Sequence, residues 1–353
     1  MRVRSAIVAM ITLAGAATLA ACGDSGGAGD PSRGASHGGG TTVTLGYFPN
    51  ITHATALVGV QKGLFAKHLG GGVKLKTATF NAGPAAVEAI FSGAVDASYV
   101  GPNPSINAWA KSHGKAIKII SGAASGGAAL VVKPSITSVP GLRGKKIATP
   151  QLGNTQDVAL RYWLKQQGLR TTKEGGGDVN IVPQDNAQTV QTFEQGTIDG
   201  AWVPEPYASR LIIEGNGRKL VDEKTLWPGG RFVVTDLVVR TDFMREHPDL
   251  VKRLLAASVE ANAHINEHPA DAARTANDAL RALTGKSLQP DVLAAAFKNV
   301  TFTNDPVAAS LRVGAEHARQ AGLLDPVDLD GIYDLRPLNE VLRSGGAAQV
   351  SDK

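Results

Sequence analysis

The sequence predicts an α/β protein with two similar lobes and a helical C-terminal tail. Short apolar runs alternate with helical patterns from residue 42 onward, which favours parallel sheets covered by helices. The same order of segments recurs about 103 residues later, and helical patterns dominate the chain after residue 242. A chain of 353 residues is long enough to form two hydrophobic cores.

The first 21 residues have the pattern of a signal peptide. A basic start, Met1–Arg4, precedes the apolar run Ala6–Ala17, which is shorter than the roughly 20 residues needed to span a bilayer. Small residues follow, and Cys22, the only cysteine of the chain, comes directly after them. The segment Thr18–Cys22 resembles the lipobox of bacterial lipoproteins, which implies that Cys22 is acylated and becomes the mature N-terminus. The alternative is an ordinary signal peptide with an incidental cysteine.

Residues 22–40 are expected to form a flexible tether that carries the lipid. Eight of the eighteen residues 23–40 are glycine, and such a segment cannot bury enough apolar surface to order itself. A flexible chain of this length reaches roughly 20–25 Å. We therefore expect the protein on the extracytoplasmic side of the cell membrane, held by its lipid anchor.

An internal repeat organises the chain after residue 42. We expect strands at 43–47, 73–80 and 96–100 and helices at 53–63 and 85–91, followed by a second copy with strands at 145–149 and 179–182 and helices at 157–167 and 188–195. The closest match aligns Gly93–Val100 with Gly196–Val203, where Gly, Asp, an aromatic residue and Val occupy the same register. Glycine suits a helix end and Asp a tight turn, so the match indicates two copies of one unit.

Two short β-rich runs, 129–132 and 232–235, flank the second copy and are candidate crossover strands. We therefore expect lobe I to comprise 41–125 and 236–353, and lobe II to comprise 126–235 with the crossover strands. The tail contains helical patterns at 248–267, 270–283, 291–298 and 307–321. Because the chain has returned to lobe I by then, these helices should pack on lobe I.

The composition excludes several classes of protein. Hydrophobic residues make up 43% and charged residues 19%, which is too apolar for a disordered chain. The formal charge of +5 comes from scattered basic residues rather than a long Lys/Arg run, so no nucleic-acid partner is expected. A single cysteine excludes an intramolecular disulfide and a cysteine-based zinc site. We expect neither a cofactor nor a metal.

A binding site is expected in the loops that follow the strands, because ligands of open α/β sheets bind beyond the carboxyl ends of the strands. The loops 47–53, 81–84, 101–105 and 153–157 are rich in Gly, Asn, Thr and Gln and contain no Lys or Arg. Helix N-termini that converge there would hold an anion through unpaired N–H groups. The candidate ligand-binding residues are Tyr47, Phe48, Asn50, His53, Asn81, Gly83, Gly101, Asn103, Ser125, Gly153, Asn154, Thr155, Gln156, Trp202 and Glu205.

Several candidates have alternative roles. The three aromatic residues are expected to cover an apolar tail of the ligand, and Glu205 either meets a ligand ammonium group or faces solvent. The loop 101–105 also offers Asn103 as a possible helix N-cap. The structural alternatives are helix capping for Asn154 and Thr155, a backbone contact for His53, and a core position for Trp202.

Four strings are similar to those of one family of binding proteins. They are Leu45–Ala54 (LGYFPNITHA), Val100–Pro104 (VGPNP), Gly153–Asp157 (GNTQD) and Ala201–Pro206 (AWVPEP). With the lipobox and the duplicated lobes, they resemble the nitrate/sulfonate/taurine branch of the solute-binding proteins of ABC importers, over residues 42–283. The resemblance implies the periplasmic-binding-protein type II fold, with two lobes, two crossovers and a ligand in the cleft between the lobes.

The resemblance implies a monomeric lipoprotein that captures a small organic anion and delivers it to an importer permease and its ATPase. A sulfonate or taurine is the favoured ligand, and nitrate and a thiamine pyrimidine precursor are the alternatives. The alternative from another class is an enzyme on the same fold. The export signal argues against an enzyme, as does the lack of a P-loop or zinc motif.

Overall fold

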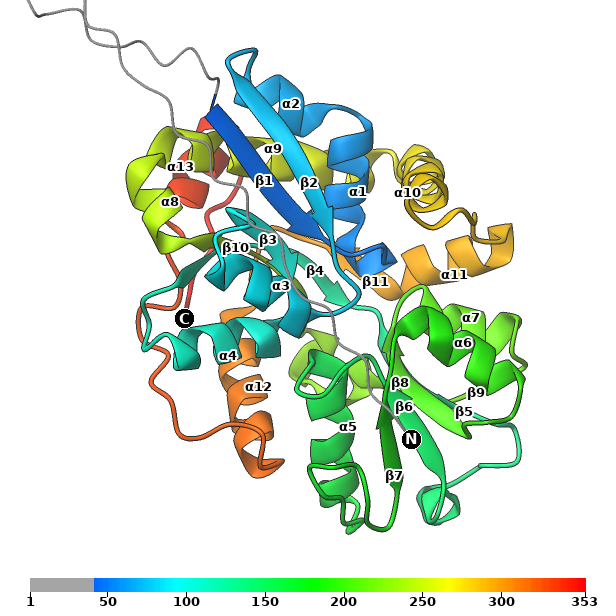
Figure 1. Cartoon of the computed structure of the whole chain (residues 1–353). Coiled ribbons are helices and arrows are strands. Elements are labelled where there is room, and N and C mark those ends of the chain that lie inside the picture. Colours follow the sequence, from blue (N-terminus) through cyan, green and yellow to red (C-terminus); the bar gives the residue numbers. More distant parts are fainter. Residues whose placement is uncertain (1–40) are drawn as a thin grey trace, which may run out of the picture. The chain divides into compact units, whose positions relative to one another are not determined.

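The computed structural model describes residues 41–353, so the predicted signal peptide, Cys22 and the tether lie outside the described residues. Two mixed sheets organise the described chain (Figure 1). The large sheet has six strands in the order β11-β4-β10-β3-β1-β2, and the small sheet has five in the order β7-β6-β8-β5-β9. The predicted α/β class with two sheets is therefore confirmed. Across residues 41–353, no helix is both long enough and apolar enough to span a membrane.

The large sheet combines parallel and antiparallel strands. Its members are β1 (Thr41–Tyr47), β2 (Val73–Thr79), β3 (Ala97–Val100), β4 (Ile117–Gly126), β10 (Val233–Arg240) and β11 (Val300–Phe302). β1 pairs in parallel with β2 and β3, whereas β10 runs antiparallel to β3 and β4. β10 is buried along almost its whole length, and its apolar sequence is interrupted by Thr235 and Asp236, which are buried as well.

The small sheet repeats this plan. Its members are β5 (Ala128–Val132), β6 (Lys146–Thr149), β7 (Asn180–Pro183), β8 (Gly200–Pro204) and β9 (Arg218–Asp222). The order β7-β6-β8 corresponds to β2-β1-β3, and the next strand, β5 or β10, is antiparallel in both sheets. Leu45–Gly46 pair with Ala97–Ser98, just as Ile147–Ala148 pair with Gly200–Ala201. The predicted internal repeat is therefore confirmed.

The predicted helices are present, with ends that differ by a few residues. The helices and 3-10 turns before the tail are η1 (Ile51–His53), α1 (Ala54–Gln61), α2 (Leu64–Leu69), α3 (Gly83–Phe91), α4 (Pro102–Lys111), η2 (Val139–Leu142), α5 (Thr155–Gln166), α6 (Asn186–Glu194), α7 (Tyr207–Ile213), η3 (Glu223–Leu226) and η4 (Pro228–Gly230). The tail has α8 (Thr241–Glu246), α9 (Pro248–Glu267), α10 (Pro269–Thr284), α11 (Pro290–Asn299), α12 (Ala308–Gln320) and α13 (Arg336–Ser344). Prolines in the first turn mark the starts of α3, α4, α9, α10, α11 and α13, as expected from the fixed φ of proline.

Two segments join the sheets. Gly126 ends β4 and Gly127 joins it to β5, and both have positive φ, 79° and 73°, which favours glycine there. The return segment passes from β9 through η3 and η4 into β10. The predicted crossover run 232–235 forms the start of β10, where Val233 pairs with Ser125. The division into lobes at 125/126 and 235/236 stays a prediction.

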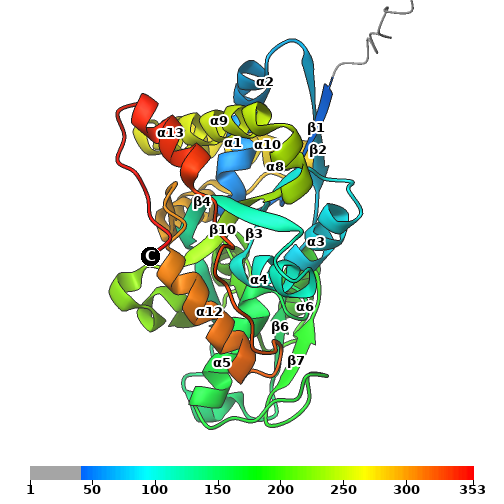
Figure 2. The same ribbon diagram turned by 90° about the vertical axis from the view of Figure 1, so that its left-hand side faces the viewer.

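The tail helices do not all pack on the large-sheet side, so that expectation was partly wrong. α9 and α10 cover α1 and α2, as predicted, but α11 contacts α7 and α12 contacts both α4 and α5. Figures 1 and 2 both show α12 running from α4 down beside α5. The ring of His317 in α12 stacks on that of Tyr162 in α5, with centroids 3.6 Å apart. The tail therefore links the two sheets.

Trp202 belongs to the core of the small sheet, so the expected contact with a ligand tail is corrected. Its side chain is fully buried and packs edge-on against Trp163 at a centroid distance of 5.8 Å. Its Nε1–H donates to Oε2 of Glu223 at 2.7 Å. The spacing in the sequence placed an aromatic residue at a strand end but could not tell which face of the sheet it would occupy.

The Glu223 carboxyl makes the stability of this core depend on pH. Burial raises the pKa of Glu223 from 4.5 to about 7, so the native state binds this proton more tightly than the unfolded chain does. The free energy of unfolding from this group therefore falls as the pH rises from about 4.5 to 7, and stays level above that. Glu223→Gln keeps an acceptor for Trp202 and removes the titration. Denaturant unfolding should show the variant gaining about 2–3 kcal/mol relative to wild type between pH 4.5 and 8. Parallel curves for the two proteins would contradict this assignment.

Candidate functional site

Three helices begin at one junction between the two sheets. α3 begins at Gly83 after β2, α4 begins directly after Gly101 at the end of β3, and α5 begins at Thr155 after β6. The N–H of Gly83 donates to Oδ1 of Asn154 at 3.3 Å, which joins the start of α3 to the start of α5. The structure thus brings together four of the predicted site residues from both sheets.

Thr155 approaches Gly101 so closely that no side chain fits between them. A Cβ atom at Gly101 would lie 2.4 Å from Oγ1 of Thr155 and 3.5 Å from the carbonyl oxygen of Val234. Gly101 itself has an ordinary φ of −73°, so the requirement for glycine is one of space and not of backbone conformation. The junction is therefore closed in this structure, with the two halves in direct contact.

The junction offers N–H groups and helix dipoles, not cations. Helix geometry leaves the N–H groups of Thr155 and Gln156 without intrahelical acceptors at the start of α5. At α4, Pro102 and Pro104 carry no N–H, which leaves that of Asn103. Each helix start adds about half a positive charge, so the junction favours an anion. Within residues 41–353, no group of three or more His, Cys, Asp or Glu side chains is placed to hold a metal ion.

Two buried hydroxyl groups at or next to the junction have no hydrogen-bond partner. They are Oγ1 of Thr155 and Oγ1 of Thr235. Thr235 follows Val234 in β10, and the carbonyl oxygen of Val234 faces Gly101. Buried polar groups are nearly always paired in native proteins. Unpaired hydroxyls beside helix N-termini therefore indicate a place where a polar ligand completes the hydrogen bonding.

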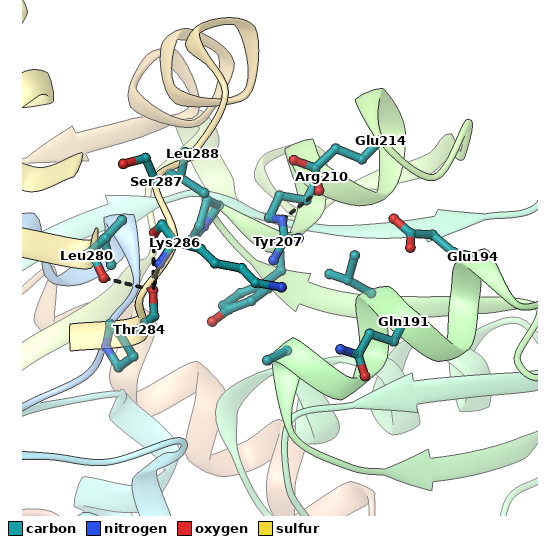
Figure 3. A pocket seen from close by; sticks show the side chains of 14 residues that line it. Gln191, Glu194, Tyr207, Arg210, Glu214, Leu280, Thr284, Lys286, Ser287 and Leu288 are labelled. Atoms are coloured by element: carbon teal, nitrogen blue, oxygen red, sulfur yellow. Dashed lines mark hydrogen bonds and ion pairs between the residues drawn. The ribbon is translucent and has the colours of Figure 1, made fainter. Parts of the chain in front are cut away.

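Two cavities are lined by residues of the neighbouring loops and of the tail. One, of about 450 Å³, is lined by the residues that follow β2, β6 and β7, and there Nδ2 of Asn81 donates to Oδ2 of Asp185 at 3.1 Å. The other, of about 390 Å³, lies between α6, α7 and the segment that joins α10 to α11. Figure 3 shows Lys286 reaching across this second cavity, whereas Arg210 is paired with Glu214 at 2.7 Å. The first cavity borders the loops that lead into α3 and α5, and so leaves room there for the remainder of a ligand.

The loop after β1 packs on itself. The N–H of Phe48 donates to Nδ1 of His53 at 3.3 Å, and the two rings stack with centroids 4.2 Å apart. Burial lowers the pKa of His53 from 6.5 to about 3, so the imidazole is neutral at neutral pH. Tyr47 and Asn50 are buried as well. His53 therefore makes a backbone contact, which was the structural alternative to its expected role in ligand binding.

Glu205 is buried, so the alternative expectation, that it faces solvent, was wrong. Its Oε1 accepts from Oγ of Ser209 at 3.0 Å and from Nδ2 of Asn299 at 2.6 Å, and its Oε2 accepts from the N–H of Ser209. Burial raises the pKa of the Glu205 carboxyl above its usual range. The side chain fastens the start of α7 to the end of α11, and contact with a ligand ammonium stays a prediction.

Asn103 and Ser125 join elements of the framework. Nδ2 of Asn103 donates to the carbonyl oxygen of Gly314 in α12 at 3.1 Å. The residue that caps α4 is Gly101, so the expected N-cap at Asn103 was wrong. Oγ of Ser125 accepts from the N–H of Phe232 at 3.3 Å and so ties β4 to the start of β10.

The start of α5 is positioned by a buried carboxylate. Oδ2 of Asp157 accepts from the N–H of Gly153 and from Nε of Arg161, both at 2.9 Å. Gly153 has a φ of 75°, which suits glycine. Nδ2 of Asn154 donates to Oε1 of Gln156 at 3.1 Å, which orients the amide that reaches Gly83. These contacts hold the 153–156 loop against the junction.

Two residues of the cleft were missed by the sequence analysis. Thr235 supplies an unpaired hydroxyl next to the junction, and Asp185 faces Asn81 in the 450 Å³ cavity. A signal existed for the first residue, because Thr235 and Asp236 interrupt an otherwise apolar run. Asp185 follows a strand end that the repeat predicted, but the carboxylate resembles an ordinary helix cap in sequence.

Comparison with known proteins identifies relatives of this chain. Residues 37–280 match the model of the NMT1-like family. The taurine-binding periplasmic protein of Escherichia coli is 30% identical over 219 residues, which cover 62% of this chain and 65% of that protein. The alignment with a binding protein of Brucella abortus also covers 65% of its length, so the chain spans just under two thirds of these curated relatives.

Solved structures share the fold. The alkanesulfonate-binding protein SsuA from Xanthomonas axonopodis pv. citri, bound to MOPS, superimposes with a TM-score of 0.67 at 18% identity, over 81% of this chain and 95% of that one. The periplasmic nitrate-binding protein NrtA from Synechocystis PCC 6803 has a TM-score of 0.72 at 15% identity, over 86% and 89% of the two chains. These similarities show that the chain has the fold of the periplasmic binding proteins, as the sequence analysis predicted.

The contact between Gly101 and Thr155 can be tested by a double-mutant cycle. Gly101→Ala should lower the free energy of unfolding by about 1–3 kcal/mol, because its Cβ would overlap Oγ1 of Thr155. Thr155→Ala alone should be nearly neutral, since the hydroxyl that it removes has no partner. In the double variant the nearest atoms lie 3.5 Å or more from the new Cβ, so most of the loss should be recovered. Additive losses in denaturant unfolding would show that the two residues do not touch.

Proposed function

The chain belongs to the NMT1-like family, and we propose that it is a solute-binding protein that holds a small organic anion in the cleft between its two sheets. The observation that carries this proposal is the unpaired hydroxyl of Thr155, buried where three helices begin. An oxyanion there would accept from this hydroxyl and from the free N–H groups of α4 and α5. The named ligands of the relatives, taurine, alkanesulfonates and nitrate, are all anionic or carry an anionic group.

We favour a sulfonate or taurine over nitrate or a thiamine pyrimidine precursor. A sulfonate places three oxygens at one end, which suits several donors that converge on one point. The cavity of about 450 Å³ that borders the loops leading into α3 and α5 would take an organic tail that nitrate lacks. Holding the charge with dipoles and hydroxyls, rather than with buried Lys or Arg, would permit release to a transporter.

Binding without catalysis is part of the proposal. The one histidine of the cleft loops, His53, has its Nδ1 occupied by the N–H of Phe48 and is neutral. Glu205 is held by Ser209 and Asn299, which leaves it poorly placed as a general base. These contacts support a cleft that binds and releases its ligand without changing it chemically.

The partners that we propose are the permease and the ATPase of an ABC importer, reached from the outer face of the cell membrane. The proposed anchor is a lipid on Cys22, supported by the lipobox-like sequence before it. Each buried CH₂ group of an acyl chain contributes about 0.8 kcal/mol, so several chains on one cysteine would hold the protein at the bilayer. We propose that the soluble part acts as a monomer.

Calorimetry with matched ligands tests the anion site. Taurine and ethanesulfonate should bind, whereas ethyl methyl sulfone, which has similar oxygens but no charge, should not. Thr155→Ala should weaken the binding of the anions about 10- to 100-fold, because a hydrogen bond to a charged group contributes about 1.5–3 kcal/mol. Thr155→Ser keeps the hydroxyl, so its affinity for the anions should stay within about threefold of that of wild type. Equal binding of the sulfone and the sulfonate would overturn the proposal.

Membrane fractionation tests the anchor. Cys22→Ser should leave the precursor uncleaved or release the protein into the soluble fraction, because no thiol remains to be acylated. Ser25→Ala, three residues further along the same segment, is the matched control and should behave like wild type. Normal processing and membrane retention of the Cys22 variant would rule out acylation at this position.

A further inference from the structure

A cavity with a different chemistry lies outside the cleft. Its volume is about 740 Å³, and it is formed by the C-terminal half of α5, the loop 168–177 and the end of α12. α5 and α12 lie side by side in Figures 1 and 2. Three of its lining residues are cations, Arg161, Lys165 and Arg170, and none is a carboxylate. The cleft junction, in contrast, has no cation among its loop residues.

Arg161 lines this cavity, and one of its buried nitrogen atoms lacks a hydrogen-bond partner. The side chain is only 2% exposed. Its Nε donates to Asp157 at 2.9 Å and its Nη1 donates to the carbonyl oxygen of Thr172 at 2.5 Å, but its Nη2 has no hydrogen-bond partner. A buried guanidinium group with a free N–H is rare in native proteins and calls for an acceptor. Asp157 compensates the charge of the group but does not reach Nη2.

The surrounding residues leave further donors available. Nζ of Lys165 donates to the carbonyl oxygen of Gln320 at 2.7 Å, which uses one of its three N–H bonds. Arg170 is largely exposed, and its Nε lies 3.7 Å from Asp178. The carboxylate of Glu174 is not part of the lining; hydrogen bonds to its own backbone and to Thr172 help to hold it, and the nearby charges of Lys173 and Arg161 also help to lower its pKa.

The backbone of the loop 168–177 requires glycine at two positions. Gly175 and Gly177 have φ values of 97° and 119°, which side chains rarely adopt. A Cβ at either glycine would lie within 2.4 Å of a carbonyl oxygen, that of Ile181 or that of Arg170. The N–H of Gly176 donates to Oγ1 of Thr172 at 3.2 Å, so the loop is internally hydrogen bonded.

We propose that this cavity binds a tetrahedral oxyanion of the phosphate type through Arg161, Lys165 and Arg170. A guanidinium with a free edge and an ammonium group are the side chains that suit phosphate oxygens. The anion is either free phosphate or the phosphate of a lipid headgroup, since the chemistry is the same. Because the lining comes from α5 and from the end of α12, an anion there would bridge the small sheet and the tail. This site is separate from the cleft and does not rest on the proposed function.

Two probes distinguish the sources of the anion. Binding of inorganic phosphate is measured by calorimetry. Binding to vesicles of phosphatidylcholine, with or without phosphatidylglycerol, is measured by sedimentation. The variants are Lys165→Gln and Arg170→Gln, which change exposed side chains and should fold normally. Lys74→Gln, on the exposed side of β2 and without an ion pair among residues 41–353, is the matched control. We expect each cavity variant to weaken binding at least fivefold and the double variant at least twentyfold, with the control unchanged.

Each outcome decides the proposal. Phosphate binding that the cavity variants weaken supports a site for a free anion. Binding only to vesicles that contain phosphatidylglycerol, weakened in the same way, supports a headgroup site. No binding of either probe, or binding that the Lys74 variant weakens as much as the cavity variants do, overturns the proposal. Arg161→Lys adds a second measurement, because it should lose phosphate affinity while circular dichroism verifies that it folds.

Discussion

The close approach of Thr155 to Gly101 is the constraint on which the rest of the cleft depends. It requires that α4, which follows a strand of the large sheet, and α5, which follows a strand of the small sheet, begin next to each other. No side chain can separate the two helix starts. Each helix begins beyond the carboxyl end of a strand, α4 after β3 and α5 after β6. The Asp157 carboxylate then holds the α5 end of the contact, and Ser125 ties together the strands behind the α4 end.

In the proposed site, an anion would be held without a formal charge opposite it. Helix dipoles, free N–H groups and an unpaired hydroxyl act together where water is excluded, so each is stronger than it would be in water. The prolines of α4 limit the number of donors, because Pro102 and Pro104 have no N–H. The proposed site thus has few donors, which suits the proposed release of the ligand to a transporter.

The sequence predicted the repeated order of strands and helices, the helix 248–267 to the residue, and three loops that meet at the junction, 81–84, 101–105 and 153–157. It could not predict partners that are distant along the chain. Asn103 looks like a helix cap in sequence, yet it bonds Gly314, and α12 reaches α5 because of a stacking contact between Tyr162 and His317. Periodicity shows which residues are apolar, but it does not show which face of a sheet they occupy.

Amide proton chemical shifts would test most directly whether the helix starts hold the anion. A ¹⁵N-labelled sample titrated with taurine should show the amide protons of Asn103, Thr155 and Gln156 moving to lower field, because each would donate to the ligand. The account would be contradicted if these resonances stayed in place while those of the Lys286 and Arg210 side chains shifted instead.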